Sequence, residues 1–175
     1  MLEQPTWYAV NTRSRQEKVA AKVLENLGVQ VFLPLVNEVH RWSDRKKTVS
    51  VPLFSSYLFV HIPSSRESQV RVLKAPGVVN FVGNHSGPLS IPDRQIDDVR
   101  SLLSRRVDCS PYPFLRIHDR VRIIGGALDG IEGTLVGRGP DTKLVISIEL
   151  IQRSMAVSLY GYEVKPVGKA RSPAA

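Results

Sequence analysis

The chain has 175 residues, of which 42% are hydrophobic and 23% charged, and its 24 Lys and Arg exceed its 16 Asp and Glu, for a formal net charge of +8. This balance is typical of a globular protein with a buried core, and it favours polyanionic partners such as nucleic acid. A single cysteine, Cys109, excludes an internal disulfide and a multi-cysteine zinc site. The sequence shows no signal-peptide pattern and no apolar run near the roughly 20 residues that span a bilayer, so we expect a cytoplasmic protein without a membrane partner.

Residues 1–105 alternate the patterns of strands and helices, which predicts an α+β layer pair. A capping box of Ser14 and Glu17 begins the first expected helix, and Gly28 ends it. β-Branched residues around a charged SDRKK segment predict a long two-stranded hairpin over 29–51. The other expected elements are strands at 7–12, 57–62 and 78–83, a helix that closes at Pro76 and Gly77, and a helix from Pro92 to about 105.

The remaining residues differ in kind. The stretch 107–114 carries two prolines and no periodicity, which predicts a linker. Short β-branched segments then alternate with glycines, and six glycines fall between 125 and 139, which predicts a small β-barrel. Because each glycine inside a helix costs ~1 kcal/mol, we expect this barrel to keep its β-structure. The predicted division is a domain at 1–105, a linker at 106–114, a barrel at 115–170 and a tail at 171–175.

The segment HDRVRIIGGALDGIEGTLVGRG, at 118–139, resembles the KOW motif, in which an acidic residue, alternating β-branched residues and a glycine loop precede an aliphatic strand. Residues 7–105 resemble the amino-terminal (NGN) domain of the NusG family, through WYAV before a basic helix start, PLFSSYLFV, APGVVNFVG and a closing helix. The resemblance implies a non-enzymatic transcription elongation factor with an NGN domain, a flexible linker and a KOW barrel. The detail VPLFSSYLFVHI resembles the specialised RfaH-like and UpxY-like antiterminators more than housekeeping NusG.

The resemblance also implies that an apolar concavity of the NGN domain docks onto the clamp helices of the RNA polymerase large subunit. The residues it places at or near that surface are Leu53, Phe54, Tyr57 and Phe59. Because successive side chains of a strand point to opposite faces, some of these residues must belong to the core. We expect Phe54 and Tyr57 at the interface, leave Phe59 open between interface and core, and expect Trp7 in the core.

Two basic clusters are candidates for nucleic-acid binding. The first lies where the amides and dipole of the first helix favour phosphate; it comprises Arg13, Arg15, Gln16 and Lys18. The second lies on the expected hairpin tip and comprises Arg41, Arg45, Lys46 and Lys47. The resemblance implies contact with non-template DNA for the first cluster and with upstream DNA for the second. A solvated charged surface is the alternative for each.

In relatives, the strand-tip region of the KOW barrel recruits a ribosomal small-subunit protein or the termination factor Rho. The matching residues are Leu150, Ile151, Gln152 and Arg153. The four histidines are isolated, and the sequence has no phosphate loop, nucleophile motif or metal-ligand spacing, so we expect neither an enzyme nor a bound cofactor. No segment resembles a dedicated oligomer interface, so we expect a monomer.

The function that the resemblance implies is an operon-specific antiterminator that suppresses pausing and modulates termination, and two alternatives to it remain open. Within the same family, the chain could be a housekeeping NusG that couples polymerase to Rho or to the ribosome. In a different class, it could be a ribosome-associated RNA-binding KOW protein, because KOW barrels also occur in ribosomal proteins. The basic charge suits all three functions and does not separate them.

Overall fold

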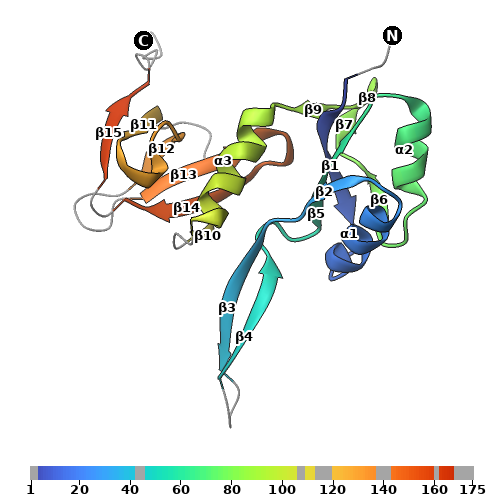
Figure 1. Ribbon diagram of the computed structural model, residues 1–175, viewed down its shortest axis with the longest axis horizontal. Coiled ribbons are helices and arrows are strands. Elements are labelled where there is room, and N and C mark those ends of the chain that lie inside the picture. Colours follow the sequence, from blue (N-terminus) through green and yellow to red (C-terminus); the bar gives the residue numbers. More distant parts are fainter. Residues whose placement is uncertain are drawn as a thin grey trace, which may run out of the picture. The chain divides into compact units, whose positions relative to one another are not determined.

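The computed structural model describes residues 4–41, 46–105, 109–112, 120–136, 143–159 and 162–167 (Figure 1). The chain divides into two compact units, Met1–Ile96 and Asp97–Ala175. The division falls inside the last helix of the amino-terminal half, α3 (Asp93–Ser104), which follows Pro92 as the sequence predicts. The domain boundaries drawn from the sequence stay predictions.

The first unit is built on an antiparallel sheet with the strand order β2-β5-β1-β6. Its central strand, β1 (Thr6–Thr12), pairs with β5 (Tyr57–Ile62) on one side and with β6 (Val78–Phe81) on the other. The edge strand β2 (Gln30–Phe32) pairs with β5, and the short β9 (Ser90–Ile91) also pairs with β1. The end of β1 therefore lies next to the start of β5, which brings the loop after β1 close to the loop before β5.

Two helices, α1 (Glu17–Asn26) and α2 (Arg66–Leu73), pack their apolar residues on one face of this sheet. The buried cluster contains Tyr8, Val10, Ala20, Ala21, Leu24, Val29, Leu58, Val60, Ile62, Val72 and Ala75. Burial of each larger aliphatic side chain here stabilises the fold by about 1.5–3 kcal/mol. Gly28 follows α1 with a positive φ of 77°, so the predicted glycine stop is confirmed.

A hairpin of β3 (Leu35–Arg41) and β4 (Lys46–Pro52) forms a separate two-stranded sheet that projects away from the main sheet of the first unit (Figure 1). Its strands pair in register from Leu35 opposite Pro52 to Arg41 opposite Lys46. The predicted projection is thus confirmed, although its first expected residues form β2 in the main sheet instead. A second, much shorter hairpin joins β7 (Gly83–Asn84) to β8 (Gly87–Pro88).

The described part of the second unit contains a six-stranded antiparallel sheet with the order β10-β14-β13-β12-β11-β15. The strands are β10 (Cys109–Tyr112), β11 (Arg120–Ile124), β12 (Glu132–Val136), β13 (Lys143–Ile148), β14 (Arg153–Ser158) and β15 (Glu163–Pro166). Short 3-10 turns, η1 (Gly126–Leu128) and η3 (Glu149–Ile151), follow β11 and β13. Apart from these turns, the described residues from 120 to 167 show the expected β-structure, and closure into a barrel stays a prediction.

The structure differs from the sequence prediction in the expected linker. Residues 109–112 are not irregular but form β10, which pairs with β14 from Cys109 opposite Val157 to Tyr112 opposite Ser154. Two prolines suggested a break in regular structure. An edge strand tolerates a proline, however, because only one side of its backbone needs hydrogen-bond donors, and β10 stands at one end of the strand order.

Candidate functional site

The loop between β4 and β5, residues 53–56, is held at several points of its backbone. The Leu53 amide donates to the Pro34 carbonyl at 2.8 Å, and the Tyr57 amide closes a turn on the Phe54 carbonyl at 3.2 Å. Ser56 adopts a positive φ of 66°, a conformation that residues other than glycine rarely take. The loop therefore has one defined shape, maintained by contacts outside itself.

The main contacts to Ser56 come from the end of β1 and the start of α1. The Thr12 amide donates to the Ser56 carbonyl at 2.9 Å, and the Ser56 amide donates to Glu17 Oε1 at 2.7 Å. Glu17 is the first residue of α1 and only 5% exposed. We call this junction of Thr12, Glu17 and Ser56 the loop latch.

The latch overturns the predicted capping box. The N-cap residue of α1 is Gln16, no side chain caps it, and Glu17 instead binds the amide of a residue 39 positions away. The local pattern of Ser14 and Glu17 is that of a capping box. A short sequence window carries no information about a long-range competitor for the same carboxylate.

Three of the four predicted polymerase-binding residues are buried. Leu53 and Phe54 are each 2% exposed, and Phe59 is fully buried. The Phe54 ring meets Phe59 edge-on with a centroid distance of 6.2 Å, so the expectation that Phe54 presents its ring at the surface does not match the structure. Tyr57, at the start of β5, is the partly exposed member of the set.

Aromatic rings line the sheet face opposite the α1 cluster. Strand alternation places Trp7 and Phe59 on this face, because Tyr8 and Val60 point into the cluster under the helices. Phe59 stacks on Phe32 with centroids 6.1 Å apart, and Trp7 lies 4.8 Å from the His61 ring. Phe54 is buried because it adds to this second apolar layer. The predicted core position of Trp7 is confirmed.

The predicted basic cluster at the start of α1 is exposed and adjoins the loop latch. Arg15 adopts a positive φ of 64°, and the Arg13 amide donates to the Gly77 carbonyl at 2.8 Å. A Cβ on Gly77, which has a φ of 87°, would lie 3.1 Å from Gln16 Cβ, so glycine allows this close approach. Lys18 Nζ donates to the Ser50 carbonyl of β4, which ties the helix start to the hairpin.

The structure places part of the predicted hairpin cluster. Lys46 and Lys47 are exposed on β4, opposite Arg41 and His40. Arg41 lies in β3, but its side chain is outside the described residues, as is all of Arg45. Because Ser50 follows Lys47 by three residues, the contact of Lys18 lies roughly 10 Å along the strand from Lys47.

The four predicted partner-binding residues of the second unit lie at the connection between β13 and β14. Ile148 pairs with Arg153 where the strands meet, and η3 turns the chain between them. Ile151 is buried, Leu150 is partly buried, and Gln152 and Arg153 are exposed, with Gln152 at a φ of 50°. All four residues thus lie at or beside a strand connection, Ile151 belongs to the core, and partner binding by this region stays a prediction.

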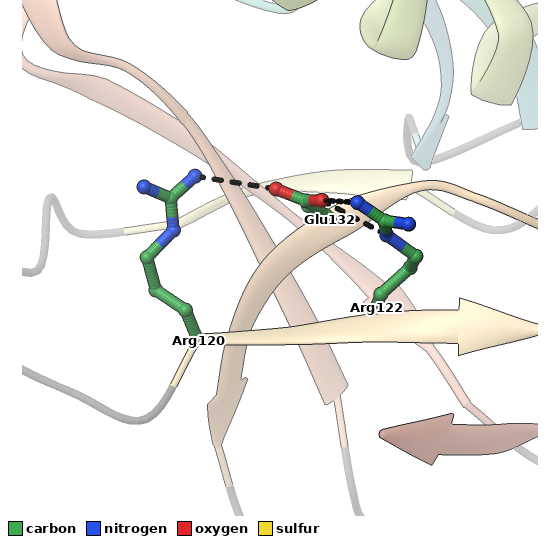
Figure 2. A network of polar contacts seen from close by, with 3 residues as sticks. All are labelled: Arg120, Arg122 and Glu132. Carbon is green, nitrogen blue, oxygen red and sulfur yellow. Dashed lines mark hydrogen bonds and ion pairs between the residues drawn. The ribbon is translucent and has the colours of Figure 1, made fainter. Parts of the chain in front are cut away.

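The second unit also carries a polar network that the sequence prediction missed (Figure 2). The Glu132 carboxylate on β12 lies between two guanidinium groups of β11. Arg122 Nε donates to Glu132 Oε1 at 2.9 Å, and Arg120 Nη2 lies 3.6 Å from Glu132 Oε2. Glu132 opposes Arg122 in the strand register, so this pair was detectable as a cross-strand match of opposite charges. We call Arg120, Arg122 and Glu132 the arginine bridge.

Within the described residues, no group of three or more His, Cys, Asp or Glu side chains is arranged to hold a metal ion. In the same part of the chain, no helix combines the length and the apolar character that crossing a membrane requires. The residues that stand out are the latched loop, the exposed cations beside it and the arginine bridge.

The family model described as "Transcription termination factor nusG" matches residues 5–100. A transcription termination/antitermination protein NusG of Thermus thermophilus is 29% identical over 172 residues, covering 87% of this chain and 94% of that protein. The Bacillus subtilis protein of the same name is 26% identical over 169 residues, covering 89% and 95%. A solved structure described as domain interaction in Thermotoga maritima NusG has the same fold, with a TM-score of 0.55, 23% identity and coverage of 87% and 92%.

These similarities define the class as transcription factors that act with RNA polymerase rather than enzymes. The family model covers more than half of the chain, so the chain belongs to the NusG family of transcription termination and antitermination factors.

Proposed function

We propose that this chain binds the clamp helices of the RNA polymerase large subunit and acts as an operon-specific antiterminator that suppresses pausing. The observation that supports docking to polymerase is the loop at 53–56, which the loop latch holds beside the partly exposed Tyr57. A surface that is ordered before binding avoids the entropic cost of ordering a flexible loop at the interface.

The polar and basic side chains beside this loop support a simultaneous contact with DNA. Arg13, Arg15 and Gln16 are exposed in the turn that follows Thr12, one of the residues of the loop latch. In our proposal these side chains and Lys18 contact non-template DNA, and the hairpin residues Lys46 and Lys47 contact upstream DNA. Such contacts neutralise phosphates, so the DNA-dependent part of the affinity falls as the salt concentration rises.

In our proposal the second unit is a KOW barrel whose β13–β14 connection binds a further partner, either a ribosomal small-subunit protein or Rho. Gln152 and Arg153 are exposed at this connection and Leu150 is partly exposed. With Ile151 buried, the polar Gln152 and Arg153 are the main contacts in this proposal. The chain acts as a monomer.

Housekeeping NusG is the second candidate function. The relatives in Thermus thermophilus and Bacillus subtilis favour it, because both are named transcription termination/antitermination protein NusG. The matches cover 94% and 95% of these two proteins. The antiterminator proposal rests instead on the resemblance of residues 51–62 to specialised paralogues. A ribosome-associated KOW RNA-binding protein is the candidate from another class, and co-sedimentation with ribosomal subunits but not with polymerase would support it.

The binding test is Tyr57→Ala, with affinity for purified RNA polymerase as the measurement. Truncation of an aromatic anchor typically costs about 2 kcal/mol, so we expect a dissociation constant weaker by at least about tenfold. Leu27→Ala is the matched control, because Leu27 is an exposed apolar residue at the far end of α1. A folded Tyr57→Ala protein that binds polymerase as tightly as the original chain contradicts the docking proposal.

The functional test is transcription in vitro on a long template with an intrinsic and a Rho-dependent terminator, with and without Rho. Increased readthrough and shortened pauses support the antiterminator. Stronger termination in the presence of Rho supports the housekeeping alternative and contradicts the antiterminator.

A further inference from the structure

Glu17 has the features of a positioning residue rather than of an ordinary surface carboxylate. It is 5% exposed, although it begins a helix whose preceding residues Arg13, Arg15 and Gln16 are all exposed. Its Oε1 atom accepts the Ser56 amide at 2.7 Å. A carboxylate is buried at a cost unless it is hydrogen-bonded, so this contact is the specific compensation that the structure provides.

The loop needs an external constraint at this position. Ser56 carries a Cβ and has a φ of 66°, which disfavours its conformation relative to the extended or right-handed regions. The Thr12 amide fixes the carbonyl of Ser56, and Glu17 fixes its amide. Both backbone groups of the strained residue are therefore held by other segments, and the Glu17 contact is the one made by a side chain.

We propose that Glu17 positions the polymerase-binding surface by locking Ser56, so that Phe54 stays packed in the aromatic layer and Tyr57 keeps its orientation at the start of β5. This inference rests on the proposed docking function. The contact requires an acceptor oxygen at the correct reach, and it does not require a negative charge, because the Ser56 amide is a neutral donor.

The requirement for reach rather than charge yields a test with two opposite substitutions. Glu17→Gln keeps a carbonyl oxygen at the same reach and removes the charge. Glu17→Asp keeps the charge and shortens the side chain by one carbon–carbon bond of about 1.5 Å, which moves the oxygen beyond hydrogen-bond distance. A role in favourable interaction with the α1 dipole predicts the reverse order, because that interaction depends on charge.

The experiment uses the full chain and measures affinity for RNA polymerase together with the amide chemical shift of Ser56. We expect Glu17→Gln to bind within about twofold of the original chain and Glu17→Asp to bind about fivefold or more weakly. The Ser56 amide resonance should keep its hydrogen-bonded shift in the first variant and lose it in the second. The control is Glu25→Asp, because Glu25 is exposed on the same helix, and it should bind as the original chain does.

The outcomes separate this inference from the docking proposal. If Tyr57→Ala weakens binding but Glu17→Asp does not, the docking proposal stands and the positioning role of Glu17 is overturned. Weaker binding by Glu17→Gln with normal binding by Glu17→Asp overturns it in favour of a charge effect. If Tyr57→Ala and Glu17→Asp both bind normally, both proposals are overturned. Circular dichroism of each variant checks its fold. If Glu17→Asp does not fold, the Ser56 amide shift of Glu17→Gln decides: normal binding with the hydrogen-bonded shift kept supports the positioning role, and normal binding with that shift lost overturns it.

Discussion

Each of the two units contains a glutamate whose carboxylate is almost removed from water, and the two glutamates serve different ends. Glu17 accepts a hydrogen bond from a backbone amide 39 residues away and thereby sets the path of a loop. Glu132 accepts from Arg122, ten residues away on the neighbouring strand, and thereby orders side chains on a sheet face. The partner of a largely shielded carboxylate therefore decides whether it fixes the path of the backbone or the position of charged side chains.

The surroundings of the two glutamates also differ: Glu17 lies beside tightly packed apolar layers, and Glu132 lies on a strand face with exposed arginines. The loop beside Glu17 lies against a sheet with apolar layers on both faces, because Phe59 and Leu58 on neighbouring positions of β5 are both fully buried. The arginine bridge lies on strands that alternate, with Arg120 and Arg122 exposed and Val121 and Ile123 buried. Substitutions that remove buried side chains near the loop should therefore reduce stability most, and substitutions that remove charge at the arginine bridge should reduce it least.

The largest expected effect is the loss of packing in the aromatic layer. Phe59→Ala removes a fully buried ring that contacts Phe32 and Phe54, and it should destabilise the first unit by about 3–5 kcal/mol. Residue-resolved hydrogen exchange of the β1 and β5 amides measures this cost. Val79→Ala is the control, since Val79 is 54% exposed, and it should leave exchange almost unchanged. Equal protection in the two variants would mean that the aromatic layer does not hold the sheet.

The second largest expected loss of stability comes from Gly133→Ala, which disturbs the close packing of two strands in the second unit. A Cβ on Gly133 would lie 2.5 Å from the Val145 carbonyl oxygen and 2.9 Å from Leu144 Cγ, and the backbone oxygen belongs to a paired strand. Gly133→Ala should therefore destabilise the β12–β13 pair by about 1–3 kcal/mol, measured by hydrogen exchange in β13.

The control for Gly133→Ala is Gly130→Ala. A Cβ on Gly130 meets no atom within 4 Å, but the positive φ of 83° should still cost roughly 1 kcal/mol. The two variants thus separate a steric clash from backbone strain. A Gly133→Ala protein that is no less stable than Gly130→Ala would show that β12 and β13 can move apart without loss.

Elements with a strong local pattern were predicted correctly. The α1 helix with its glycine stop, α3 after Pro92 and the hairpin of β3 and β4 all follow from periodicity and from residues that begin or end an element. These signals lie within a few residues of the element that they specify, so they can be recognised without knowledge of tertiary contacts.

The features that the sequence prediction missed depend on distant partners. Glu17 matches a local cap, yet the Ser56 amide competes for its carboxylate. Phe54 looks like a surface aromatic in the sequence, but its ring packs edge-on against Phe59, which itself stacks on Phe32 of another strand. Strand β10 contains Pro111 and has no alternation of its own, and it exists because β14 pairs with it. Tertiary contacts override local preference in each case.

The smallest expected loss of stability is at the arginine bridge. Glu132→Gln keeps an oxygen that can accept from Arg122 but removes both ion pairs. Arg120 and Arg122 are 64% and 47% exposed, so water screens these pairs, and the loss should be below about 1 kcal/mol. Denaturant unfolding at low and high salt measures this loss, which should shrink as salt rises because partly exposed charges are screened.

The control is Glu163→Gln, because Glu163 is an exposed residue on β15 of the same sheet. A loss at Glu132 that does not change with salt would mean that hydrogen-bond geometry, as at Glu17, and not charge, holds the bridge together.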